Sequence, residues 1–200
     1  MGAGWCVLRI HNALLSVGVD SKVLVAEKHS TDPLVFKMLP NGLNQHKRFK
    51  NPLLRKTMTF LRSIGLFSNK KDKTDAMQCK IHWNTSVTWF SPITNYDVLK
   101  SPLVQEADII HLHWVAGFLD YETFFAKINK PIVWTLHDQN IALGGFHYMR
   151  DKLNNYQCCK FLEDYYSGLK QKAIRGNNKI HLIALSDMMQ QFLKSQVFLQ

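Results

Sequence analysis

Histidines stand at the ends of two short apolar runs, where they could take part in chemistry. His111 and His113 alternate in the first run, so both are expected on one face of a strand. His137 and Asp138 directly follow the second run, at 131–136. A histidine there could donate a hydrogen bond to a sugar hydroxyl or a phosphate, or act as a general base. Asp138 could orient the imidazole of His137 or cap the turn that follows.

Two other roles are possible for these histidines. A histidine at a strand end can simply bond to a backbone carbonyl. Together with His147, the histidines at 111, 113 and 137 also suggest a metal site, since imidazole is a common zinc ligand. No cysteine or carboxylate stands at ligand spacing near them in the sequence, so we expect packing and hydrogen bonding here and no metal.

Glycines form two further candidate contacts. Gly2 and Gly4 come just before the first predicted helix, where backbone N–H groups could approach a phosphate. Gly144 and Gly145 open a loop that continues through His147 to Tyr148, and this loop either lines a sugar pocket or is an ordinary surface loop. Two more strand-end residues complete the candidates, Trp114 and Ser186.

The elements that must position these residues alternate along the chain. Apolar periodicity predicts helices at 5–17, 121–128, 160–174 and 187–195, and apolar runs predict strands at 22–27, 87–90, 108–113, 131–136 and 180–185. Alternating strands and helices imply a parallel sheet covered by helices on both faces. Ligands of such sheets bind beyond the carboxyl ends of the strands, where the candidate residues stand.

Residues 28–80 do not follow this pattern and are expected to form a basic insert. The chain has a net charge of +10, and the run 47–73 holds nine basic residues and one acidic residue. A short basic amphipathic helix is predicted near 53–65. The insert could contact an anionic membrane surface or remain solvated. Few aromatic residues accompany the charges, so no nucleic acid is expected as a partner.

Cysteine usage and hydropathy indicate a cytoplasmic location, with possible peripheral contact at the inner membrane face through the insert. The four cysteines form no Cys-x-x-Cys pair, which is typical of reduced thiols in a cytosolic protein. No apolar run approaches the roughly 20 residues that cross a bilayer.

In their order along the chain, these motifs resemble family 4 glycosyltransferases. The most specific likeness is the run 130–138 followed by 144–148; the segments 2–25, 107–114 and 183–186 are also similar. The resemblance implies an α/β fold, the N-terminal Rossmann-like domain of the GT-B architecture. It implies transfer of a sugar from a nucleotide-sugar co-substrate to a glycan acceptor, such as a polysaccharide or a lipid-linked glycan, with no other cofactor.

The resemblance also implies residue roles. His137, with Asp138, would lie by the reacting sugar, and Gly2 and Gly4 near the donor diphosphate. Substrate binding is expected from His111, His113, Trp114, Gly144, Gly145, His147 and Ser186. The family's first strand and its C-terminal nucleotide-sugar domain have no counterpart in the sequence, so we expect residues 1–200 to form one acceptor-side domain that is inactive alone. The alternative is a non-catalytic Rossmann-like module that binds anionic partners through its basic arm.

Overall fold

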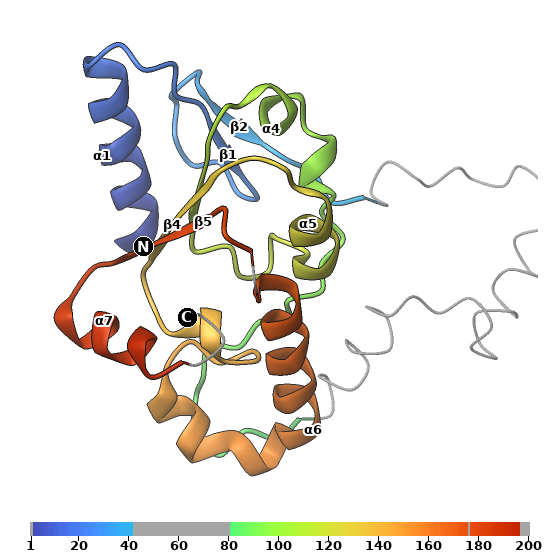
Figure 1. Cartoon of the computed structure of the whole chain (residues 1–200). Coiled ribbons are helices and arrows are strands. Elements are labelled where there is room, and N and C mark those ends of the chain that lie inside the picture. The colour runs from blue at the N-terminus through green and yellow to red at the C-terminus, as the bar shows by residue number, and fades with distance from the viewer. Residues whose placement is uncertain (1, 42–80, 176, 197–200) are drawn as a thin grey trace, which may run out of the picture.

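A computed structural model of the chain describes residues 2–41, 81–175 and 177–196 (Figure 1). Over these residues the fold is mixed α/β, with two small parallel sheets flanked by helices. The basic run 47–73 and the amphipathic helix expected near 53–65 lie outside the described residues. Among the helices that are described, none combines the length and the apolar character needed to cross a bilayer.

The first sheet follows a long N-terminal helix. Helix α1 spans Gly2–Ser16 and ends before Gly18, whose φ of 82° is a conformation that glycine adopts readily. Strand β1 (Val23–Val25) then pairs in parallel with β2 (Val35–Lys37). The helix predicted at 5–17 and the strand predicted at 22–27 are therefore confirmed, whereas β2 was not predicted.

His11 ties α1 to the loops around this sheet. Its side chain is buried, and its Nδ1 atom lies 2.8 Å from the Ser21 hydroxyl. Its Nε2 atom lies 3.6 Å from the Asp32 carboxylate. These contacts reach the chain on both sides of β1, so they hold the helix in place against the sheet.

The second sheet has the strand order β3-β4-β5, and all neighbours are parallel. Strand β3 spans Ile110–His113, β4 spans Ile132–Leu136 and β5 spans Ile180–Ala184. Helix α5 (Tyr121–Lys127) connects β3 to β4, and its N-terminus is capped by the Asp120 carboxylate, which accepts from the Thr123 N–H. The predictions of three strands and of the helix at 121–128 are confirmed.

Helix α6 connects β4 to β5 and is longer than predicted. It spans Met149–Ile174, whereas periodicity predicted only 160–174. The backbone at Cys159 leaves helical geometry (φ −137°, ψ 18°), so α6 bends there (Figure 1). The part of α6 before the bend is mostly polar, so the spacing of apolar residues does not reveal it. Helix α7 (Asp187–Lys194) follows β5 as predicted, and the short helix α4 (Pro102–Glu106) was not predicted.

The prediction of a strand at 87–90 is wrong. The structure has only an isolated antiparallel bridge there, between Trp89 and Phe146, and the Phe90 N–H donates to the Gly145 carbonyl over 3.0 Å. The apolar residues serve a different purpose from the one predicted. Trp89 is buried with its ring against Tyr166, so this segment packs onto a loop and a helix rather than into a sheet.

Two hydrophobic clusters support the candidate residues. The larger joins the β3–β5 sheet to α5, and it includes Ile132, Trp134, Tyr121 and Phe124. The smaller joins α6 to the loop before it, through Trp89, Phe146, Leu162 and Tyr166, among others. Burial of each large side chain contributes about 2 kcal/mol, so the larger cluster stabilises β4 and the smaller one stabilises the loop before α6.

Candidate functional site

Two histidines meet where β3 and β4 end. The Nδ1 atom of His113 lies 3.1 Å from the Nε2 atom of His137. Parallel pairing sets this contact, because His113 is in register with Thr135 and His137 follows two residues later. Both side chains are half-buried rather than sealed in the interior. The predicted meeting of these histidines at one edge of the sheet is confirmed.

His111 lies beside this pair. Its ring centre is 4.1 Å from that of His113, which confirms that the two alternate residues share one face of β3. Its Nε2 atom lies 2.8 Å from the Thr135 hydroxyl of the neighbouring strand. His111 is thereby held by the sheet and supports the ring of His113.

Burial keeps these three imidazoles neutral near pH 7. It lowers the pKa of His113 to about 4, with smaller contributions from His111 and His137 in the same direction. Burial also lowers the pKa of His111. For His137, burial lowers the pKa and the nearby charge of Asp138 opposes it. Neutral imidazoles offer both a donor and an acceptor nitrogen.

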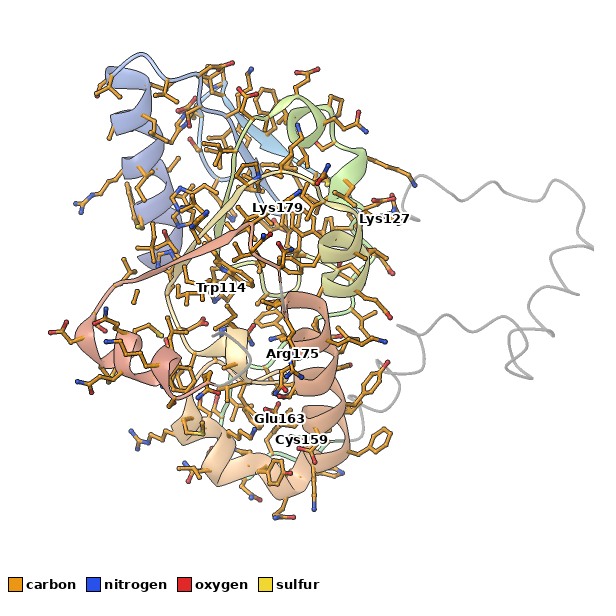
Figure 2. All side chains as sticks on the ribbon, in the orientation of Figure 1. Trp114, Lys127, Cys159, Glu163, Arg175 and Lys179 are labelled. Carbon is orange, nitrogen blue, oxygen red and sulfur yellow. The ribbon has the colours of Figure 1, made fainter. Side chains whose placement is uncertain are left out.

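Trp114 follows β3 in an unusual conformation. Its φ is +33°, in the left-handed region that bulky residues avoid. Its side chain is 44% exposed, and its ring packs edge-on to Phe90 and tilted against His147. Strained backbone of this kind costs about 1–3 kcal/mol and clusters at binding sites. We refer to His113, Trp114 and His137 together as the rim; Figure 2 labels Trp114 near the centre of the molecule.

The Asp138 carboxylate bonds to His147 and not to His137. The carboxylate lies 2.5 Å from Nδ1 of His147 and accepts the Asn140 N–H over 3.0 Å. The expectation that it orients His137 is therefore wrong, and the alternative role of capping the following turn is confirmed. His147 is buried, and its other nitrogen, Nε2, has no hydrogen-bond partner in the described part of the chain.

A small hollow opens beside the rim. Its lining includes Trp114, Tyr121, His137, Asp138 and His147. The enclosed space has room for about one water molecule. A sugar ring therefore fits only over the mouth of the hollow, with Trp114 and His137 as its neighbours.

The glycine loop, residues 144–148, is buried at 144–147 and exposed only at Tyr148, so it is neither an open pocket lining nor an ordinary surface loop. The Gly144 and Gly145 N–H groups donate to the two carboxylate oxygens of Glu163 over 2.8 and 2.7 Å. An added Cβ would meet backbone oxygen of Glu163 at 2.2 Å from Gly144, and the Trp89 ring at 2.1 Å from Gly145. The prediction that Gly144 and Gly145 bind substrate is therefore wrong. Their N–H groups already donate to Glu163, and both residues pack against bulky neighbours.

Lys170 supports the same loop from α6. Its ammonium donates to the Asn140 carbonyl, the Asn140 side-chain oxygen and the Leu143 carbonyl, over 2.7 to 3.0 Å. Glu163 and Lys170 are both almost completely buried (Figure 2 labels Glu163 on α6). Sequence reasoning missed both residues, since charged residues on a polar helix ordinarily face solvent.

The remaining predicted residues lie in the first turn of a helix or directly before one. Gly2 and Gly4 lie in the first turn of α1. The prediction that they form a phosphate-binding loop before that helix is therefore wrong. An added Cβ at either residue would meet nothing within 4 Å. Ser186 caps α7, where its hydroxyl accepts the Met189 N–H over 3.2 Å. Ser186 thus has a structural role at the end of β5.

Cys6 of α1 reaches the rim, which the sequence did not indicate. One potential ligand atom each of Cys6, His113 and His137 lies within 4.8 Å of the others. All three side chains are half-buried. The N-terminal part of α1 therefore lies against the carboxyl ends of β3 and β4, and Figure 1 shows the start of α1 beside β4.

With this geometry in view, comparison with known proteins gives no relative: no family model, no curated protein and no solved structure matches the chain.

Proposed function

We propose that the chain is the acceptor-side, Rossmann-like part of a family 4 glycosyltransferase of the GT-B type, and that it binds a sugar at the rim. The observation that carries the proposal is the meeting of His113 and His137 beside an exposed Trp114, at the carboxyl ends of two parallel strands. Sheets of this kind bind ligands at that end. The likeness of 130–138 and 144–148 to the family's motifs adds to this support.

The chemistry of the rim suits a sugar. Neutral imidazoles match hydroxyl groups, which both donate and accept hydrogen bonds. The face of Trp114 provides apolar area for the C–H side of a sugar ring, at little cost in side-chain entropy. In this proposal His137 bonds to a sugar hydroxyl, Trp114 stacks on the ring, and the Asp138–His147 pair holds the floor of the hollow.

The co-substrate would be a nucleotide-sugar donor and the acceptor a glycan, with no other cofactor. Contact with an anionic membrane through 47–73 remains a prediction about residues outside those described. The competing hypothesis, a non-catalytic module with a basic arm, depends on that same run. No feature of the described residues favours it over sugar binding.

Saturation-transfer NMR tests the proposal directly. The probes are the methyl glycosides of glucose, galactose and mannose, with UDP-glucose and GDP-mannose in parallel samples, all in buffer with EDTA. We expect enhancement of ring protons for at least one probe. Trp114→Ala and His137→Gln should each weaken binding about tenfold or more, because truncating an anchor residue typically costs over 1 kcal/mol.

Phe161→Ala is the matched control, since Phe161 is an exposed aromatic residue on α6 that does not line the hollow. It should leave every enhancement unchanged. The proposal fails if no probe is enhanced, or if Trp114→Ala and His137→Gln bind every probe as well as the wild-type chain does.

A further inference from the structure

Three residues with metal-binding side chains converge from separate elements. Cys6 comes from α1, His113 from β3 and His137 from the residue after β4, and one ligand atom of each lies within 4.8 Å of the other two. Cysteine sulfur with imidazole nitrogen is a donor set typical of zinc. From the sequence we expect no metal at these histidines, because the third ligand stands more than 100 residues earlier in the chain.

The spacing is close to that of a tetrahedral site. With the usual zinc bond lengths, two nitrogen ligands lie ~3.3 Å apart and a nitrogen and a sulfur lie ~3.6 Å apart. The two histidine nitrogens are already 3.1 Å apart. From the 4.8 Å limit, the thiol has to approach by only about 1 Å, which rotation of the Cys6 side chain can supply.

The surroundings hold these ligands in place. The ring of His113 packs on His111, which is itself held by Thr135 on the neighbouring strand. Helix α1, which carries Cys6, is anchored through buried His11 to the loops around β1. Ligands that are fixed by neighbouring contacts lose little entropy when a metal binds.

We propose that Cys6, His113 and His137 bind a zinc ion, which leaves one coordination position for water or a ligand oxygen. Metal-bound, the three residues join α1 to the ends of β3 and β4. Metal-free, the two imidazoles share a hydrogen bond and the thiol lies beside them. The inference does not depend on the proposed sugar binding but competes with it at His137, because an imidazole nitrogen that binds zinc cannot also bond to a sugar hydroxyl.

Cobalt titration tests the site through its spectrum. The full chain is stripped with a chelator, and Co²⁺ is added under reducing conditions. We expect one equivalent to produce visible bands of tetrahedral cobalt together with a thiolate-to-cobalt charge-transfer band in the near ultraviolet. Zinc should abolish both, because it displaces cobalt from sites of this kind.

Variants assign the ligands. Cys6→Ser should abolish the thiolate band. His113→Gln or His137→Gln should weaken Zn²⁺ affinity by at least about tenfold, because even the loss of a residue that only supports a ligand costs about that much. Cys158→Ser and His181→Gln are matched controls, since Cys158 lies on α6 and His181 is exposed on β5. Both should leave the spectrum and the affinity unchanged.

Circular dichroism on each variant separates loss of a ligand from loss of the fold. The proposal is overturned if folded wild-type chain takes up no stoichiometric Co²⁺ or Zn²⁺. It is equally overturned if Cys6→Ser retains the thiolate band, since another cysteine then supplies the sulfur. Because the sugar experiment is run in EDTA, either proposal can fail while the other stands.

Discussion

The rim and the glycine loop both involve the chain that follows β4, yet they are built in opposite ways. In the glycine loop, the amides of Gly144 and Gly145 are bonded to buried Glu163, and Lys170 donates to three oxygens nearby. At the rim, half-buried imidazoles contact one another and Trp114 keeps a strained backbone. The loop's polar groups stabilise the fold, whereas the rim keeps polar and aromatic groups accessible to a ligand.

The strongest test of this comparison is Gly145→Ala in the loop. The new Cβ would lie 2.1 Å from the Trp89 ring, which is buried and packs against Tyr166. We expect the free energy of unfolding to fall by about 3 kcal/mol, measured by urea denaturation. Gly168→Ala on α6 is the control, because its Cβ meets nothing within 4 Å and should add up to about 1 kcal/mol of stability.

Glu163→Gln tests the same loop electrostatically. The amide keeps one acceptor oxygen and turns a donor toward the other loop N–H, so a buried donor loses its partner. We expect a loss of about 2 kcal/mol in urea denaturation. Asp164→Asn, one residue along the same helix and exposed, should change stability by less than about 0.5 kcal/mol. Equal effects of the two substitutions would show that Glu163 does not support the loop.

Lys170→Met sharpens the comparison through pH. Burial lowers the pKa of Lys170 to about 7, although Glu163 and Asp138 oppose this shift. An unfolded lysine titrates near 10.4, so between these values the unfolded chain binds more protons than the folded chain. The stability of the wild-type chain relative to Lys170→Met should therefore rise with pH from about 7 to about 10, with a slope of up to about 1.4 kcal/mol per pH unit. If the stability difference between the two chains does not change with pH, the Lys170 ammonium is solvated and its pKa is not lowered by burial.

The smallest effect on stability is expected at the rim itself. Trp114→Asn removes ring contacts with Phe90 and His147, but asparagine tolerates a positive φ and relieves the strain. These effects oppose each other, so the free energy of unfolding should change by less than about 1 kcal/mol, while sugar enhancement in the NMR experiment is lost. A loss above about 3 kcal/mol would mean that the rim is part of the structural core.

The predictable part of the molecule is the part with a local signal. Apolar runs rich in β-branched residues predict β3 and β4, and parallel pairing then brings His113 to His137 without further information. The segment 87–90 carries the same signal and is not a strand, because Trp89 finds its partners in a loop and a helix. Local propensity does not identify the partner of a segment.

What could not be predicted depends on long-range packing. The burial of Glu163 and Lys170 follows from how α6 lies on the glycine loop, and nothing in the polar sequence around them differs from that of a surface helix. The approach of Cys6 to the histidines similarly depends on the path of α1 across the strand ends. Such contacts join residues far apart in sequence, where periodicity carries no information.

Strand β5 has a consequence for how the protein behaves in solution. Within the described chain it lies at the outer side of its sheet, and Ile183 and Leu185 expose apolar side chains there. An outer strand of this kind invites pairing with a second copy. The net charge of +10 keeps copies apart, and salt shortens the range of that repulsion to about 8 Å at physiological ionic strength. Dilute buffer should therefore keep the chains dispersed, and added salt should bring them together.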